Sequence, residues 1–164
     1  MTPVEQPAHK PTTRVVLVAA LLAIAVAGTG GSLTILDDWY FSLNQPWFKP
    51  PDWAFGPAWT ILFALMAWSG ALGWAASAGQ ATRRKQLILL WTANAVFNIG
   101  WSLLFFFLQR PELALMEVPL LWASVFMLIR HKRAYAPKAA MLLWPYLAWV
   151  TLASAINLGV VVLN

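Results

Sequence analysis

The segment WYFSLNQPWFKPPDWAFGPAW, from Trp39 to Trp59, separates two long apolar runs and decides how the rest of the chain is interpreted. Its four prolines hold the backbone in extended or turn conformations, so the segment loses little conformational entropy on ordering. Its four tryptophans each offer a broad apolar face and one N–H donor, which suits a boundary between water and an apolar interior. The segment is therefore predicted to form a stiff aromatic lid over a ligand pocket.

The apolar runs on both sides of this lid are long enough to cross a membrane. The chain has 164 residues, of which 60% are apolar and 10% charged, and this composition lies outside the range of soluble domains. Since about 20 apolar residues span a hydrocarbon core, the sequence predicts an all-α integral membrane protein, a bundle of five transmembrane helices. The expected parts are a disordered polar tail at 1–14 and one membrane domain at 15–164, with spans at 15–36, 54–78, 86–108, 113–129 and 139–163 and a lid loop at 37–53.

The basic side chains are distributed unevenly between the two sides of this expected bundle. Nine of the eleven precede the first span or lie in the second and fourth connections, and only Lys49 and Arg110 lie on the opposite side. By the positive-inside rule, the N-terminus is predicted to be cytoplasmic. The net charge of +5 thus indicates topology and contact with anionic lipid, and no nucleic-acid partner is expected.

Helical spans favour the bacterial cell membrane over the outer membrane as the location. The first apolar run has an alternative interpretation as a signal peptide, because a positive region precedes it and Ala-Val-Ala at residues 25–27 resembles a cleavage site. The continuation of the apolar run to Leu36 favours an uncleaved span.

The third expected span is the most polar of the five. Asn94, Asn98 and Trp101 follow helical spacing, and Phe105 continues it, so the four side chains share one face. An amide inside a bilayer needs hydrogen-bond partners, so this face must look into the bundle or into a cavity. Two interpretations remain open: the amides line a pocket, or they join helices through hydrogen bonds worth about 1 kcal/mol each.

A similar face recurs in the fifth expected span, after Pro145. Tyr146, Trp149, Ala153 and Asn157 are spaced by three, four and four residues, which places them on one side of a helix. The small Ala153 leaves a recess in which a flat molecule could lie. Core packing around a proline kink is the alternative interpretation.

The chain offers no convincing catalytic or metal-binding constellation. It contains no Cys and only two His, one in the tail and one in a basic connection, so no metal site is predicted and no cofactor is expected to be required. A haem iron would lack its usual axial ligands, so a tetrapyrrole, if bound, would be held by shape, stacking and hydrogen bonds. Glu117 is the only acid inside an expected span, and whether it has a role stays open.

Three blocks of sequence resemble the signature of the TspO/MBR family, the tryptophan-rich sensory proteins, translocator proteins and peripheral-type benzodiazepine receptors. The first block is the lid segment, W-Y-x-x-L-N-x-P-W-x-x-P-P-x-W-x-F-x-P-x-W from Trp39 to Trp59. The second is N-x-x-x-N-x-x-W from Asn94 to Trp101, and the third is P-Y-x-x-W-x-x-x-A-x-x-x-N from Pro145 to Asn157. In this order and on five spans, the blocks are specific, and the resemblance to a bacterial member covers roughly residues 15–163.

The resemblance implies a bundle that is usually a homodimer and binds porphyrins under the lid, and in some members cholesterol or drug-like ligands. Trp39 and Trp149 match tryptophans linked to light-dependent breakdown of protoporphyrin, which makes them candidate catalytic residues. The chain lacks the aromatic-then-basic end of animal relatives, which argues against sterol binding here. Motif position assigns Tyr40, Pro50, Trp59, Phe63, Asn94, Trp149 and Ala153 to the ligand, and the shared faces add Asn98, Trp101, Tyr146 and Asn157.

The leading hypothesis is a membrane receptor or sensor that binds porphyrin-like tetrapyrroles such as protoporphyrin IX and affects tetrapyrrole handling or a stress response. One alternative is an enzyme that degrades porphyrin in light. The other is a transporter of tetrapyrroles or other lipophilic ligands, although five spans do not divide into two equal repeats. The expected partners are a porphyrin or another flat lipophilic ligand, the lipid bilayer and a second copy of the chain.

Overall fold

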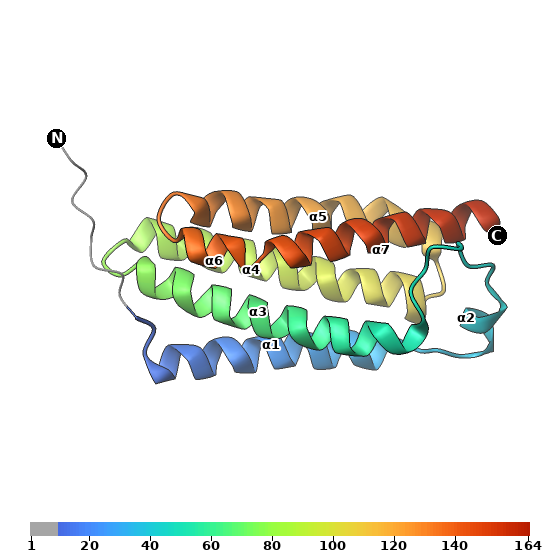
Figure 1. The fold of residues 1–164 in the computed structure, drawn as a ribbon, viewed down its shortest axis with the longest axis horizontal. Helices are drawn as coiled ribbons and strands as arrows, with labels where there is room; N and C mark the ends of the chain where they lie inside the picture. Colours follow the sequence, from blue (N-terminus) through green and yellow to red (C-terminus); the bar gives the residue numbers. More distant parts are fainter. Residues whose placement is uncertain (1–9) are drawn as a thin grey trace.

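The computed structural model describes residues 10–164, and this part of the chain is helical with no β-strand. Five helices are long and apolar enough to cross a membrane, which confirms the predicted architecture. They run side by side, with the start of α1 at one end of the bundle and the lid and C-terminus at the other (Figure 1). The long helices are α1 (Thr13–Leu33), α3 (Phe55–Ala76), α4 (Ala81–Ser102), α5 (Pro111–Arg133) and α7 (Trp144–Leu163).

Helix α1 begins before the expected first span. The Thr12 side chain accepts a hydrogen bond from the Val15 N–H at 3.4 Å, which satisfies one of the free donors of the first turn. Residues 13 and 14, which the predicted tail included, are therefore helical. Residues 1–9 of that predicted tail lie outside the described residues.

Helix α4 continues into a π-helical turn, η2 (Leu103–Phe107), in which the Leu108 N–H bonds to the Leu103 carbonyl at 2.8 Å. A π-turn holds more residues than an α-turn, so it rotates the side chains that follow it relative to α-helical spacing. Trp101 and Phe105 remain neighbours, with their rings stacked at 5.3 Å between centroids, but Phe105 does not line the pocket that Asn98 and Trp101 line. Phe105 is 4% exposed and belongs to a small core under the lid together with Tyr40, and Phe106 lines the pocket described below.

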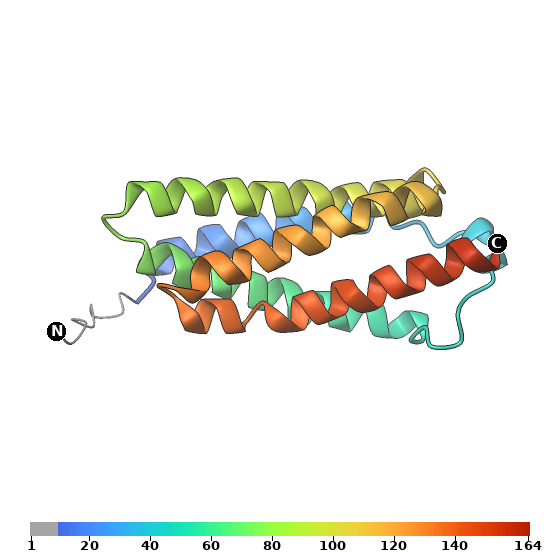
Figure 2. The same cartoon turned by 90° about the horizontal axis from the view of Figure 1, so that it is seen from above.

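The fifth span is interrupted rather than continuous. A short helix, α6 (Pro137–Met141), is followed by α7, and the Leu147 N–H bonds to the Leu143 carbonyl at 3.0 Å to start the new helix. Pro145 lies in the first turn of α7, where its missing N–H costs nothing because first-turn donors have no helical partner. The predicted proline kink is thus a change of helix, visible in Figure 2 between the two dark-orange segments.

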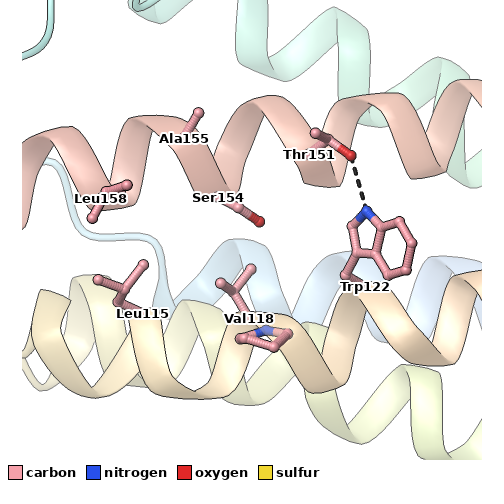
Figure 3. Close-up of a pocket in the computed structure, with 8 residues that line it drawn as sticks. Leu115, Val118, Trp122, Thr151, Ser154, Ala155 and Leu158 are labelled. Atoms are coloured by element: carbon pink, nitrogen blue, oxygen red, sulfur yellow. Dashed lines mark hydrogen bonds between the residues drawn. The ribbon is translucent and has the colours of Figure 1, made fainter.

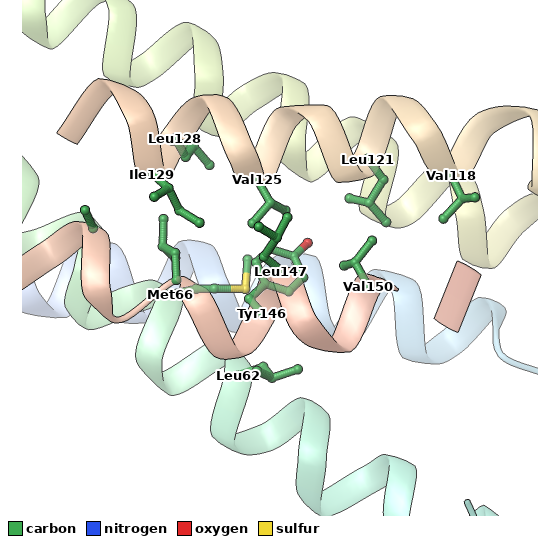
Figure 4. Close-up of a cluster of buried hydrophobic side chains, with 12 residues drawn as sticks. Leu62, Met66, Val118, Leu121, Val125, Leu128, Ile129, Tyr146, Leu147 and Val150 are labelled. Carbon is green, nitrogen blue, oxygen red and sulfur yellow. The ribbon is translucent and has the colours of Figure 1, made fainter. Parts of the chain in front are cut away.

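The main core lies between α3, α5 and α7. In Figure 4, apolar side chains of α5 face those of α7, with Leu62 and Met66 of α3 reaching the same cluster. Between apolar helices in lipid, stability comes from close packing more than from the hydrophobic effect. The members are Leu62, Met66, Val118, Leu121, Val125, Leu128, Ile129, Ala140, Leu143, Tyr146, Leu147 and Val150.

Lys132 departs from its expected place in a solvated basic connection. It lies in the last turn of α5 and is 0% exposed. Its Nζ donates to Ser69 Oγ at 2.8 Å and lies 4.3 Å from the centre of the Trp91 ring. Ser69 Oγ in turn donates to the Ala139 carbonyl at 2.6 Å. The prediction was wrong for this residue: the ammonium joins α3, α4, α5 and α6 inside the bundle, with its charge facing an aromatic ring.

The lid, residues 37–53, includes a short helix, α2 (Asp38–Ser42), and ends within a 3-10 turn, η1 (Asp52–Ala54), which leads into α3. Its middle is fastened to the end of α7. The Asn44 N–H donates to Asn164 Oδ1 at 3.0 Å, and Asn164 Nδ2 donates to the Asn44 carbonyl at 3.1 Å. Next to this pair, Pro46 is packed so closely on Gly159 that an added Cβ would lie 2.9 Å from two ring atoms.

This close approach predicts that Gly159→Ala destabilises the protein. The methyl group has no room beside the rigid Pro46 ring, and overpacking typically costs about 1–3 kcal/mol. Thermal unfolding in detergent should show a lower midpoint. Gly28→Ala is the matched control, because a Cβ there meets nothing within 4 Å and alanine is favoured in helices by about 1 kcal/mol. If Gly159→Ala is as stable as the unchanged chain, the lid does not pack on α7 as described.

Candidate ligand-binding site

A pocket of about 710 Å³ lies under the lid and extends between α1, α3 and α4. This volume falls in the usual range for small-molecule sites. On one side its wall is helix α1, which contributes mainly small residues. The lining residues are Ala20, Ala23, Ile24, Ala27, Gly30, Gly31, Thr34, Leu36, Tyr40, Asp52, Phe55, Gly56, Trp59, Thr60, Phe63, Ala64, Ala67, Asn98, Trp101, Ser102, Phe106, Trp149 and Ala153.

The pocket is hollow because α1 turns glycine and alanine toward it. A Cβ at Gly30 would lie 3.6 Å from Ser102 Oγ, which is ordinary contact, so α1 and α4 lie close together there. A Cβ at Gly31 or Gly56 would meet nothing within 4 Å. Small residues thus let the helices assemble while leaving space between them.

The inner wall of the pocket is aromatic. Trp59 is at its centre, with its ring centroid 5.6 Å from Phe63 and 6.4 Å from Trp149 in an edge-to-face arrangement. Phe55 packs on Trp149 at 5.5 Å. The Trp149 Nε1 atom is buried and has no hydrogen-bond partner among the described residues. A buried indole N–H normally finds an acceptor, so this one lacks the partner that burial usually requires.

Behind this wall, a polar junction ties α4, α5 and α7 together. The Tyr146 hydroxyl, 0% exposed, accepts hydrogen bonds from Asn98 Nδ2 at 3.0 Å and from Asn94 Nδ2 at 3.3 Å. Asn94 Nδ2 also donates to Ser124 Oγ at 2.8 Å. The two amides therefore have partners within the protein, as a bilayer interior requires.

A second polar contact joins the same helices nearer the lid. Trp101 Nε1 donates to Asn157 Oδ1 at 3.2 Å, and Asn157 Nδ2 donates to the Pro111 carbonyl at 2.8 Å. Asn157 is 0% exposed. The open alternatives from the sequence thus both hold for α4, because Asn98 and Trp101 line the pocket and also bind neighbouring helices.

The roof of the pocket is a compact polar cluster in the lid. The Tyr40 hydroxyl donates to Asp52 Oδ1 at 2.6 Å, and Lys49 Nζ bonds both to Asp52 and, at 3.3 Å, to the Tyr40 oxygen. Burial, followed by the hydrogen bond to Asp52 and the carboxylate charge, raises the pKa of Tyr40 above its usual value. The phenol therefore stays protonated and keeps donating to Asp52 over the physiological range.

Seven of the predicted site residues line the pocket and five do not. Among the five, Trp39 packs against Phe105 at 6.2 Å, and Pro50 lies in the lid outside the lining. Asn94, Tyr146 and Asn157 are buried in the polar contacts behind the wall. The seven that line the pocket are Tyr40, Trp59, Phe63, Asn98, Trp101, Trp149 and Ala153.

Sequence reasoning did not assign the α1 wall, Asp52, Phe55, Ser102 or Phe106 to the site. The α1 wall had a detectable signal, since Ala19, Ala23, Ala27 and Gly31 recur at four-residue spacing, and three of these four residues line the pocket. Phe106 had no detectable signal in the sequence, because it lies in the π-turn, where α-helical spacing does not predict which side chains line the pocket.

A shallower groove of about 420 Å³ runs along the outer side of α5 and α7. Figure 3 shows it between the two helices, with Trp122 Nε1 donating to Thr151 Oγ1 at 2.9 Å. The Ser154 hydroxyl donates to the Val150 carbonyl at 2.7 Å. Since these polar groups already have partners, the groove is a less specific candidate than the aromatic pocket.

Glu117 lies on α5, and both of its carboxylate oxygens are enclosed without a hydrogen-bond partner among the described residues. It lines neither the pocket nor the groove, so no function is assigned to it. Among residues 10–164, no cluster of three His, Cys, Asp or Glu side chains could hold a metal ion.

Comparison with known proteins places this geometry in context. Residues 16–163 match the TspO/MBR family. A tryptophan-rich protein TspO from Archaeoglobus fulgidus is 38% identical over 157 residues, covering 90% of this chain and 96% of that protein. A tryptophan-rich sensory protein from Cereibacter sphaeroides is 33% identical, covering 88% of each chain. The translocator protein of Homo sapiens is 29% identical, covering 73% of this chain and 70% of its own.

The geometry behind the aromatic wall predicts a structural role for the Tyr146 hydroxyl. Tyr146→Phe removes the acceptor shared by two buried amides, which should lower stability by about 1 kcal/mol, with ligand affinity changed less than about two-fold. Thermal unfolding and ligand titration in the same detergent measure both. Tyr135→Phe is the matched control, because that hydroxyl is buried and has no partner in the part of the chain that the structure describes. A large loss of affinity with unchanged stability would instead make Tyr146 a ligand contact.

Proposed function

The chain belongs to the TspO/MBR family, and on that premise we propose that it is a membrane receptor for flat, lipophilic tetrapyrroles such as protoporphyrin IX. The ligand would lie in the aromatic pocket under the lid and affect tetrapyrrole handling or a stress response. The observation that carries the proposal is Trp149: it lines the pocket, stands edge-to-face with Trp59, and has an indole N–H with no partner among residues 10–164.

The aromatic wall supports a flat ligand in preference to a branched aliphatic one. Ring faces of Trp59, Phe63 and Trp149 border the same space, and each aromatic pair adds about 0.5–1.5 kcal/mol beyond area burial. The Trp149 N–H would find an acceptor on the ligand. No metal–protein bond is invoked, because the lining contains no His, Cys or Met.

We further propose that the lid faces the side opposite the cytoplasm, in the bacterial cell membrane. The first turns of α4 carry Arg83, Arg84 and Lys85, and α6 carries Lys138, at the end of the bundle away from the lid (Figure 1). Basic residues favour the cytoplasmic side. Because the chain has no Cys, a single cysteine introduced as Trp47→Cys or as Lys85→Cys reports the orientation. In intact cells, we expect an impermeant thiol reagent to label the Trp47→Cys variant and not the Lys85→Cys variant.

Titration of protoporphyrin IX in the dark against tryptophan fluorescence tests the binding proposal. We expect saturable quenching, weakened at least about ten-fold by Gly31→Leu because the added side chain would occupy pocket space, a change of about 1.4 kcal/mol. Gly28→Leu is the matched control: it lies on the same helix, its Cβ also meets open space, and it does not line the pocket. Equal affinities for the two variants would place the ligand elsewhere.

The light-dependent enzyme alternative is favoured by one observation, the contact of Trp149 with the pocket. The same titrated sample, illuminated and followed by pigment analysis, separates it from a receptor. Conversion of several equivalents per protein, lost in Trp149→Phe and retained in Trp39→Phe, would support turnover at the pocket tryptophan. Pigment loss equal to that of free protoporphyrin would leave the receptor as the function.

A further inference from the structure

The exposed part of the pocket lining is confined to one side of the bundle. Apart from Leu36 and Asp52 at the lid, every exposed lining residue belongs to α1 or α3. Ile24 is 66% exposed although it borders the pocket. The remaining members on α4, η2 and α7 are buried or half-buried. We call this opening the α1/α3 slot; it is bordered by Ile24, Gly31, Gly56, Thr60 and Ala64.

The slot opens at the depth of the spanning helices. Lining residues of α1 extend from Ala20 to Gly31, which is about 17 Å along a helix at 1.5 Å per residue. The side chains bordering the slot are small apart from Ile24, and added Cβ atoms at Gly31 and Gly56 meet open space. In a bilayer this opening therefore faces hydrocarbon and not water.

At the aqueous end of the pocket, the exposed lining is limited to Leu36 and to Asp52, whose side chain is 41% exposed. Tyr40 is 7% exposed, and the Lys49 side chain is 12% exposed. Both are bonded to Asp52, and the lid is fastened to α7 by the reciprocal hydrogen bonds of Asn44 and Asn164. A ligand arriving from water would have to break these contacts.

We propose that the pocket takes its ligand from the bilayer through the α1/α3 slot while the lid stays closed. The inference rests on the proposed binding function and narrows the ligand class to molecules that dissolve in the hydrocarbon layer. Helix α1 suits such a passage, because Gly30 is its only buried residue and its side chains facing the pocket are mostly small.

The test measures rates of protoporphyrin quenching by stopped flow, with the full chain in lipid vesicles. Ala64→Trp places a bulky side chain at the slot. Association and dissociation should slow together by about ten-fold or more, leaving the dissociation constant within about two-fold, because a blocked passage changes both rates equally. Ile61→Trp is the matched control, since Ile61 lies on the same helix, is 60% exposed and does not line the pocket. Ile24→Trp repeats the test from α1.

A second arm holds the lid shut. Asn44→Cys with Asn164→Cys, joined by a short bifunctional thiol reagent, adds the only two cysteines to the chain. We expect quenching rates within about two-fold of the unlinked protein. Rates should also fall when extra lipid is added at fixed ligand, since the ligand is then more dilute in the bilayer.

Several outcomes would overturn the lateral route. Quenching rates that are unchanged in both Ala64→Trp and Ile24→Trp would mean that the ligand enters past the lid. Binding abolished by the cross-linked lid would mean the same. Faster binding on dilution to monomers would mean that a second copy covers the slot. Absence of saturable quenching in the unchanged chain would instead count against the proposed function, so the two failures are distinguishable.

Discussion

The hydrogen bonds of the Tyr146 hydroxyl organise the rest of the structure. A polar group within a bilayer cannot form hydrogen bonds with water. The Asn94 and Asn98 amides of α4 therefore both donate to the Tyr146 hydroxyl of α7, and Asn94 also donates to Ser124 of α5. This junction fixes how three helices face one another at the depth of the pocket. The junction joins α4, α5 and α7 on the side of the aromatic wall away from the pocket. The bundle therefore does not need side chains filling the pocket beside Trp59 to stay assembled.

The lid is attached by a different kind of contact. Its polar cluster and its bonds to the end of α7 lie at the aqueous end of the bundle, where exposed ion pairs and hydrogen bonds are individually weak. Several of them act together with the Pro46–Gly159 contact and with prolines that limit the unfolded alternatives. The site is thus bounded by a firm polar junction at depth and by a set of small, additive contacts at the surface.

The sequence predicts the five spans from length and hydropathy, and helical spacing predicts Asn98, Trp101, Trp149 and Ala153 as lining residues. Tyr40, Trp59 and Phe63 are predicted only through the resemblance to the TspO/MBR motifs. The sequence does not predict where a regular helix gives way to another. In the π-turn after Ser102, Phe106 lines the pocket and Phe105 does not. The break before Trp144 separates α6 from α7. Lys132 shows most clearly what the sequence does not predict. It belongs to a basic run that indicates a connection between spans, yet its Nζ contacts Ser69 and the Trp91 ring, which are distant in sequence.

Helix α1 has one buried residue, and along much of its inner face it borders empty space instead of side chains. A molecule that filled this space would supply the packing that the other four helices receive from one another. Ligand occupancy of the pocket and the stability of the folded bundle are then linked, since a ligand that binds only the folded state stabilises it by mass action. The amount of intact protein in a membrane would follow the local supply of its ligand, without any need for a separate signalling partner.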